Sequence, residues 1–473
     1  MSYDLLTTSG INNLINSYKT TEQNKLLTPL NSRKTLYQNL TSAYSIISNR
    51  LESLKSILSD LKNINTDSIF NSKKATTSNT SFVNVSSTAS AVEGAFTLRV
   101  NQLAKNDSAL SYDLNSSDIS TFITEPGTHE FEIVSGDGTG GNFTSTIAVN
   151  FIESDFSNGE ITNSAVMQKI QNAINNDKAV VNSNSITGST LADGSFVIDL
   201  NGTETTINYS AGSYSEVMDS IVSQINEISG LTAEKVEDGE NFQLKITVNE
   251  SSKYITIKDD TSTLLSELGI NVTQEKGASG IVTASVFSPL SGVSQLSLTS
   301  KSSGSDFRIM SLTDINGGNA LNSLGLNLGS ERTGFVQNEF VDTPGFIYST
   351  DQLNSKLLFN GVNVERNSNS ISDLITGTTI SIKNTMVETD ADVSITVGKD
   401  TSIIKTKIEE FVTKFNDIYT YIRNNSKNVD GKRGALIGDP TASSIINTLS
   451  SFAYTRVSGI ANDKINSLCI DNF

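Results

Sequence analysis

An uninterrupted heptad pattern between residues 26 and 61 is the feature that most restricts how this chain can fold. Its large side chains are spaced alternately by four and three positions, with one basic residue among them. They are Leu26, Leu30, Arg33, Tyr37, Leu40, Tyr44, Ile47, Leu51, Leu54, Leu58 and Leu61. A period of 3.5 keeps a narrow apolar stripe of a helix turned toward a partner helix. The pattern therefore predicts a coiled-coil helix of about 50 Å that cannot bury its own stripe.

A second heptad pattern lies near the other end of the chain. Its apolar positions are Ile404, Ile408, Phe411, Phe415, Ile418 and Ile422. Asp400 precedes it as an expected N-cap, which predicts a helix over residues 400–425. Asp439 followed by Pro440 predicts a further helix over residues 440–456, because proline suits the first helical position. We expect the second seam to pair with the half of the first that lies nearest the strands.

Two residues of the long helix leave alternatives open. Pro29 predicts a kink or a fresh start, since proline removes a backbone hydrogen bond. Arg33, if buried in the seam, would fix register or partner choice. If it lies at an exposed end of the helix, its charged head simply reaches water.

The chain between the two seams changes to the period of strands. Residues 82–85 and 94–100 predict two strands, with Phe96, Leu98 and Val100 on one face. Residues 106–345 are rich in alternating segments separated by turns such as Asn201-Gly202. We therefore expect an α+β multidomain fold, with long coiled-coil-type helices at the ends and β-rich domains inserted between them.

Two internal similarities predict that a strand–helix–strand module is duplicated in the inserted region. Residues 164–175 match residues 215–226 as short amphipathic helices, with Ser164 and Ser215 as the expected N-caps. Residues 265–271 likewise match residues 321–327. Chance similarity between short helices is the alternative.

These patterns divide the chain into four parts. We expect an N-terminal coiled-coil leg, a strand pair of the core leg domain, inserted head domains with repeats, and a return to the core leg domain. Their expected bounds are residues 1–70, 71–105, 106–345 and 346–473.

The net charge of −17 argues against binding to nucleic acid or to an anionic membrane. No run approaches the ~20 apolar residues of a membrane span, and no cleavable secretory signal is visible. We expect no membrane insertion and no nucleic-acid partner.

Residues that could carry chemistry are few, and we expect no catalytic, cofactor or metal site. His129 is expected in an exposed loop, and Cys469 as a buried, inert thiol. The glycine-rich stretch 136–141 lacks the Lys-Ser/Thr ending of a phosphate loop and predicts a hairpin tip. The pairs Asp259-Asp260 and Asp390/Asp392 lack the spacing of a calcium loop and are expected to be solvated turn acids.

Several ordered segments resemble the flagellar filament-capping proteins, the hook-associated protein type 2 family. Residues 29–58 are similar to that family's N-terminal coiled-coil helix, and residues 85–104 to its strand pair. Residues 359–380 and 434–439 are similar to its C-terminal part, in the same order.

The resemblance implies a structural protein without enzyme activity at the distal tip of the bacterial flagellum. It implies a homo-oligomeric, pentamer-like ring that promotes flagellin polymerisation and prevents leakage of monomers. Flagellin and the hook–filament junction proteins are the implied partners, and export follows the flagellar type III route without a cleaved signal.

Members of the family continue beyond the block at residues 434–439 and finish with another long heptad helix. We therefore expect either a truncated chain or a cap that lacks half of its leg. The part of the first seam that carries Arg33 is expected to pair with such a helix or with a neighbouring subunit.

Two other functions are alternatives. One is a surface adhesin whose head domains bind host or matrix glycans. The other is an unrelated extracellular hydrolase with an unrecognised pair of acidic residues.

Overall fold

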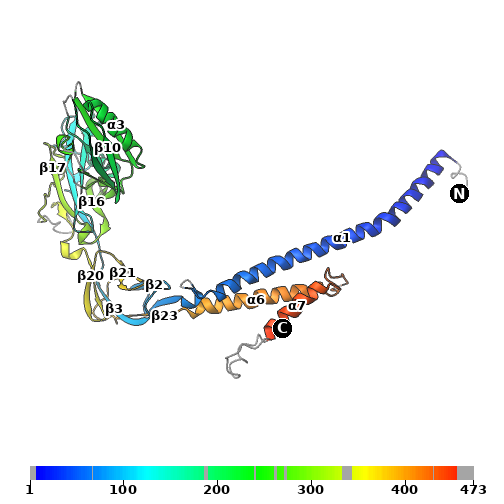
Figure 1. Cartoon of the computed structure of the whole chain (residues 1–473). Coiled ribbons are helices and arrows are strands. Elements are labelled where there is room, and N and C mark those ends of the chain that lie inside the picture. The colour runs from blue at the N-terminus through cyan, green and yellow to red at the C-terminus, as the bar shows by residue number, and fades with distance from the viewer. Residues whose placement is uncertain are drawn as a thin grey trace.

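The computed structural model describes residues 7–65, 68–185, 190–238, 241–259, 264–270, 274–332, 343–429 and 431–454. Figure 1 shows a long helical leg, a β-rich body at one end of the leg and a β-rich head beyond the body. The chain passes from the leg through the body into the head and returns by the same route. The predicted α+β architecture with long helices at its ends is confirmed.

The leg contains α1 (Thr8–Lys62), α6 (Thr401–Asn425) and α7 (Pro440–Tyr454). The predicted caps of the last two helices are confirmed. Asp400 Oδ1 accepts the N–H of Ser402 at 2.9 Å, and Asp439 Oδ1 accepts the N–H groups of Thr441 and Ala442 at 2.9 and 3.0 Å.

α1 starts earlier than the heptad pattern, because the Thr7 hydroxyl accepts the N–H of Gly10 at 3.1 Å and caps the helix. It continues through Pro29 without a fresh start. The residues around Pro29 are exposed, so water can reach the carbonyl of Lys25 that the proline leaves without a partner.

The body packs two antiparallel sheets around one core. The first has the order β1 (Lys73–Thr77), β23 (Val393–Lys399), β3 (Gly94–Gln102), β19 (Ser355–Phe359) and β20 (Val362–Arg366). The second has the order β2 (Val83–Ser87), β22 (Thr378–Ile382) and β21 (Ser370–Ile375). The two predicted strands at 82–85 and 94–100 therefore belong to different sheets, and Leu98 and Val100 are buried in the core between them.

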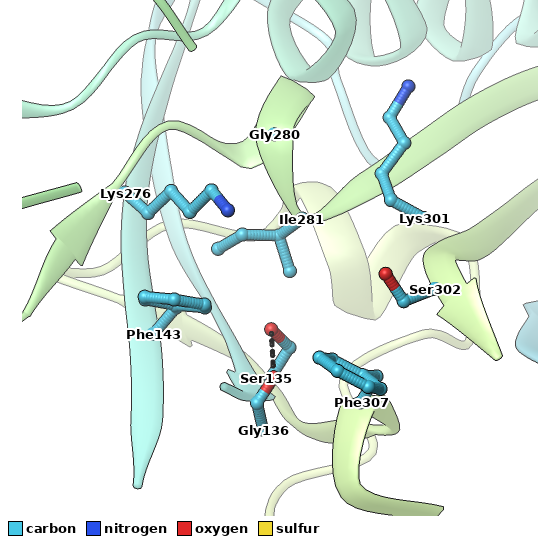
Figure 2. A pocket seen from close by; sticks show the side chains of 9 residues that line it. All are labelled: Ser135, Gly136, Phe143, Lys276, Gly280, Ile281, Lys301, Ser302 and Phe307. Atoms are coloured by element: carbon cyan, nitrogen blue, oxygen red, sulfur yellow. Dashed lines mark hydrogen bonds between the residues drawn. The ribbon is translucent and has the colours of Figure 1, made fainter. Parts of the chain in front are cut away.

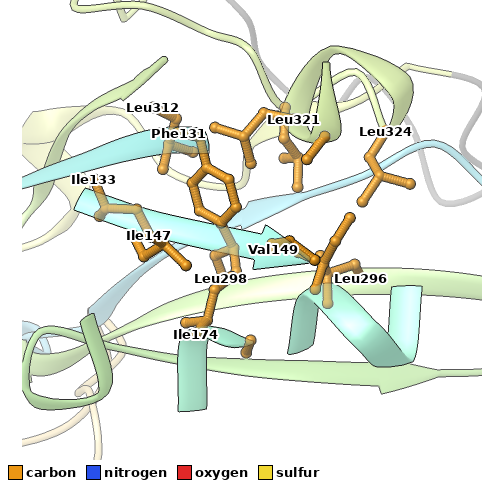
Figure 3. Close-up of a cluster of buried hydrophobic side chains, with 14 of the residues drawn as sticks. Phe131, Ile133, Ile147, Val149, Ile174, Leu296, Leu298, Leu312, Leu321 and Leu324 are labelled. Atoms are coloured by element: carbon orange, nitrogen blue, oxygen red, sulfur yellow. The ribbon is translucent and has the colours of Figure 1, made fainter. Parts of the chain in front are cut away.

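In the first module of the head, module A, the strands pack against α2 (Asn163–Asn176). One sheet has the order β15 (Val282–Phe287), β16 (Val293–Ser303), β4 (Asn106–Leu110) and β18 (Gly345–Phe346), and β5 (Leu114–Asn115) pairs with β16. The other strands are β7 (Asn142–Phe151), β6 (Gly127–Gly136) and β17 (Ile309–Ile315), and α5 (Ala320–Ser323) follows β17. Figure 3 shows side chains from both sheets, including Phe131 and Leu298, meeting Ile174 of α2 in the core.

The second module, module B, repeats these elements in the same order. It contains β8 (Val180–Asn182), β9 (Gly194–Leu200), β10 (Thr203–Tyr209), α3 (Tyr214–Asn226), β11 (Leu231–Asp238), β12 (Asn241–Val248), β13 (Tyr254–Asp259) and α4 (Leu264–Glu267). Its sheet β11-β12-β8 corresponds to β15-β16-β4, and its trio β10-β9-β13 corresponds to β7-β6-β17. Module B is inserted between α2 and β15, so the copies are nested.

The strand β14 (Glu275–Lys276) joins the two modules. It pairs with β13 of module B and with β7 of module A, which makes one seven-stranded sheet of the order β10-β9-β13-β14-β7-β6-β17.

The same pair of side-chain hydrogen bonds occurs once within each module, which confirms the duplication. Asn175 of α2 donates to the carbonyl of Ala284 at 2.8 Å and accepts the N–H of the same residue at 2.9 Å. Asn226 of α3 makes the same pair of bonds with Ala233, at 3.0 and 2.8 Å.

The predicted N-caps of these helices were misplaced by two residues. Thr162 caps α2 and Ser213 caps α3, the latter in a reciprocal pair with Glu216. Ser164 and Ser215 lie inside the first turn instead. A hydroxyl residue occurs at both positions of each helix, so local sequence alone did not separate them.

A buried ion pair lies within module A, at the strand β4 through which the chain enters that module. Asp107 has a fully buried side chain and accepts a 2.8 Å hydrogen bond from Nη1 of Arg332, whose other Nη also pairs with it. The same carboxylate accepts the N–H of Ile309 at 2.9 Å. The Arg332 guanidinium stacks 4.0 Å from the ring centre of Phe346.

Candidate assembly interface

The leg is the candidate functional site, and its centre is an antiparallel contact between α1 and α6. Figure 1 shows α6 lying along the part of α1 nearest the body. Three residues of α1 are buried in the core cluster of this contact: Ala43, Ile47 and Leu54. Ile57 of α1 is buried as well. Phe415, Ile418 and Ile422 of α6 are buried in the same cluster.

The register of this seam follows the expected one from Leu40 to Leu54 and departs from it at Leu58. Leu40, Ile47, Leu54 and Leu61 face the partner as predicted, half-buried or buried. Of the predicted positions between them, Tyr44 and Leu51 are partly buried and pack against the same cluster. Leu58 departs from the prediction, because it is exposed and its neighbour Ile57 is buried instead. Leu58 is 45% exposed, whereas Ile57 is 8% exposed.

Two physical features explain why a second register, through Ala43, Arg50 and Ile57, contributes beside the expected one. Both registers satisfy alternating steps of three and four, so the heptad rule alone cannot choose between them. Ala43 is small enough to let another element approach closely, and Arg50 finds two partners on α6. Its Nη1 pairs with Asp417 Oδ1 at 2.5 Å, and its guanidinium lies 4.5 Å from the ring centre of Tyr421.

Tyr44, which packs against this cluster, also joins α1 to the start of α7. Its hydroxyl donates a 2.6 Å hydrogen bond to Asp439 Oδ1. Burial raises the pKa of Tyr44, and the bond to the Asp439 carboxylate raises that pKa further. The bond from Tyr44 in turn lowers the pKa of Asp439.

The α6 seam is less complete near the body. Ile404 and Phe411 are half-buried, but Ile408 is 48% exposed. Its neighbour Lys407 reaches α1 instead, where Nζ lies 3.2 Å from Asp60 Oδ2.

The distal part of α1 exposes the rest of its predicted stripe. Leu26, Leu30 and Tyr37 are 68%, 59% and 64% exposed, and Arg33 is exposed as well. The Arg33 side chain is therefore not buried by any described part of this chain. A contiguous apolar stripe on an exposed helix is typical of an interaction surface.

Comparison with known proteins bears on these same segments. Residues 9–107 match the family model described as flagellar hook-associated protein 2 N-terminus, and residues 353–470 match the one described as its C-terminus. At both of its ends, the chain matches the flagellar hook-associated protein 2 family. The matched segments contain the leg and nearly all of the body, while modules A and B lie almost entirely between them.

Individual relatives agree with the family. The B-type flagellar hook-associated protein 2 of Pseudomonas aeruginosa is 24% identical over 216 residues, or 44% of either chain. The A-type protein of the same species is 23% identical over 236 residues, or 48% of either chain. The chain thus spans about half the length of the curated relatives it matches.

Solved structures of the family are also similar. The D1-D2-D3 domains of the flagellar cap protein FliD from Escherichia coli share 15% identity, covering 89% of this chain and 79% of theirs, with a TM-score of 0.33. FliD from Pseudomonas aeruginosa shares 15% identity, covering 75% of this chain and all of its own, with a TM-score of 0.29.

Residues that could carry chemistry serve local structure where they are described. His129 was expected in a loop, but it lies half-buried in β6, where its Nδ1 accepts the N–H of Asn319 at 3.3 Å. Residues 136–141 form the β6–β7 hairpin tip as predicted. Asp390 accepts the N–H of Val387 at 2.8 Å, and Asp392 pairs with Arg99 at 2.8 Å.

Other expectations fall partly or wholly outside the described residues, as for Asp260 and Cys469. Asp259 ends β13 instead of lying in a turn. Within the described ranges, no three His, Cys, Asp or Glu residues gather into a group suited to a metal ion. None of the helices described is both long and apolar enough to cross a membrane.

Proposed function

We propose that this chain caps the distal end of the bacterial flagellar filament, where it forms a homo-oligomeric ring. The ring promotes flagellin polymerisation and prevents flagellin monomers from leaking away. The observation that carries this proposal is the family match of both ends of the chain, at residues 9–107 and 353–470.

The exposed stripe of α1 supplies the means of assembly. Leu26, Leu30 and Tyr37 would each gain about 1.5 kcal/mol or more from full burial, so the stripe favours pairing with another helix. We assign this stripe, together with the α1–α6 seam behind it, to the leg that contacts neighbouring subunits and incoming flagellin.

The finer features of the function follow the family resemblance. The ring is pentamer-like, the partners are flagellin and the hook–filament junction proteins, and the role is structural, without catalysis. The chain acts outside the cell at the flagellar tip, after export through the flagellar type III route. In the division into parts at 1–70, 71–105, 106–345 and 346–473, we assign assembly of the ring to the terminal parts. We assign the outer surface of the cap to the part at 106–345.

A deletion strain tests this function. Loss of the chain should release flagellin monomer into the medium and abolish filaments, and expression of the chain in trans should restore them. Normal filaments in the deletion strain would overturn the proposal.

The stripe has its own test in the same strain. Leu26→Asp combined with Leu30→Asp should fail to restore filaments, because charge on the stripe opposes helix pairing. Asn24→Asp combined with Ser32→Asp adds the same charge to neighbouring polar positions and should restore them. Equal rescue by both variants would show that the stripe takes no part in assembly.

The alternative of a glycan-binding adhesin is not favoured by the family matches, which describe hook-associated proteins.

A further inference from the structure

A small cavity lies beside β14, the strand that joins modules A and B. Its volume is about 60 Å³, several times the space that one water molecule requires. Its lining comes from both sheets of module A and from the end of the inserted segment. Figure 2 shows the residues: Ser135, Gly136, Phe143, Lys276, Gly280, Ile281, Lys301, Ser302 and Phe307.

Lys276 brings an unbalanced positive charge to this cavity. Its Nζ lies 4.5 Å from the ring centre of Phe143, and no described carboxylate forms an ion pair with it. Several other lysines of the head are paired, among them Lys235 with Asp219, Lys253 with Glu250 and Lys258 with Glu204. Burial lowers the pKa of Lys276, because the ammonium loses water without gaining an anion.

Two hydroxyl groups add hydrogen-bond donors to the same space. Ser302 Oγ makes no hydrogen bond to any described residue, and Ser135 Oγ makes only a long 3.4 Å bond to the carbonyl of Gly136. In Figure 2 both hydroxyls and the Lys276 ammonium point toward the opening, while the Lys301 side chain extends away from it.

The walls of the cavity are fixed by close backbone contacts. A Cβ atom at Gly136 would lie 2.1 Å from the carbonyl oxygen of Asp306, and one at Gly280 would lie 1.8 Å from that of Ser251. The backbone that forms these walls is therefore held in place before any ligand arrives, which reduces the entropic cost of binding.

We propose that this cavity binds a small tetrahedral oxyanion of the phosphate or sulfate type. Such an ion supplies the missing counter-charge for Lys276 and offers several acceptor oxygens to donors that lie in different directions. Because β14 pairs with both β13 and β7, the bound ion braces the joint between the two modules. The site is independent of the capping role.

Calorimetric titration of the 473-residue chain with inorganic phosphate, sulfate and acetate at constant ionic strength tests the site. Phosphate or sulfate should bind more tightly than acetate. Lys276→Met should weaken phosphate binding at least tenfold. Lys301→Met, which removes the neighbouring lysine that points away, should change it less than twofold. Equal phosphate binding by Lys276→Met and the unaltered chain, or preference for acetate, would refute the assignment.

A second measurement needs no variant and so does not depend on how Lys276→Met folds. Phosphate should protect the Lys276 amine from acetic anhydride several-fold, as quantified by peptide mass spectrometry, while acetylation of Lys301 stays unchanged. Absence of selective protection would also overturn the proposal.

Discussion

The Tyr44 hydroxyl donates a 2.6 Å hydrogen bond to Asp439 Oδ1, although 395 residues separate the two in the chain. The same oxygen accepts two backbone N–H groups in the first turn of α7. One carboxylate thus caps α7 and holds its start against the middle of α1. This contact links the two family-matched ends of the chain.

Tyr44→Phe should loosen this link and lower the melting temperature of the leg by on the order of a few degrees. The bond from Tyr44 lowers the pKa of Asp439 below its ordinary value of 3.8, so it stabilises the fold above that value and is lost as the pH falls below it. Thermal denaturation followed by circular dichroism should therefore show a difference at pH 7 that shrinks below about pH 4. A difference that grows in acid would contradict this account.

The seam register can be tested with two adjacent residues. Ile57→Ala should destabilise the leg by about 2 kcal/mol or more, because it leaves a cavity where a buried side chain stood. Leu58→Ala should cost within about 0.5 kcal/mol in the isolated chain, because that side chain is already exposed. Urea denaturation measures both, and equal losses would favour the register expected from sequence.

Arg332→Met should destabilise module A by about 3 kcal/mol or more, because it leaves the buried Asp107 carboxylate without its cation. The matched control is Arg366→Met, which breaks an exposed pair with Asp373 and should cost less than about 1 kcal/mol. Chemical denaturation compares the two. Similar costs for both variants would mean that the buried pair contributes no more than a surface one.

Asp177 follows α2, at the position where the chain passes from module A into module B. Its carboxylate accepts the Ala278 N–H at 2.7 Å and the Ser145 hydroxyl at 2.8 Å. Burial raises its pKa above the ordinary 3.8, and the hydrogen bonds offset this only in part. The stability that this raised pKa provides is complete below about pH 3.8 and is lost as the pH rises through the folded-state pKa.

Asp177→Asn removes that titration and should flatten this part of the pH dependence. Denaturation of both proteins between pH 4 and pH 7 should show the unaltered chain losing stability relative to the variant as the pH rises. Parallel curves would show that the charge on Asp177 has no energetic effect on the joint.

Much of the local structure could be predicted from sequence. The caps at Asp400 and Asp439 and the Asn201-Gly202 turn each depend on one or two neighbouring residues. Asn201 and Gly202 have φ values of +53° and +87°, which asparagine and glycine tolerate best. Such signals need no knowledge of the remainder of the chain.

The order of the two internal sequence matches could have predicted that one module is inserted in the other. The helix match runs from module A to module B, whereas the match between residues 265–271 and 321–327 runs from B back to A. This reversed order is what insertion of one copy into the other produces. The pairing of strands across the joint could not be predicted, because it depends on β14. That strand has only two residues and shows no alternating pattern.

The sequence by itself determined that α1 would be long and that one stripe of it would need a partner, because a heptad period is a property of consecutive residues. The tertiary structure alone decided which residues of that stripe are covered. Tyr44 and Leu51 pack against the cluster as their period predicts, but Ala43 is buried in it as well and Arg50 contacts Asp417 and Tyr421 of α6. Ile57 is buried where Leu58 was expected. A helix can present two adjacent stripes of equal period, and only the contacts offered by its partner distinguish them.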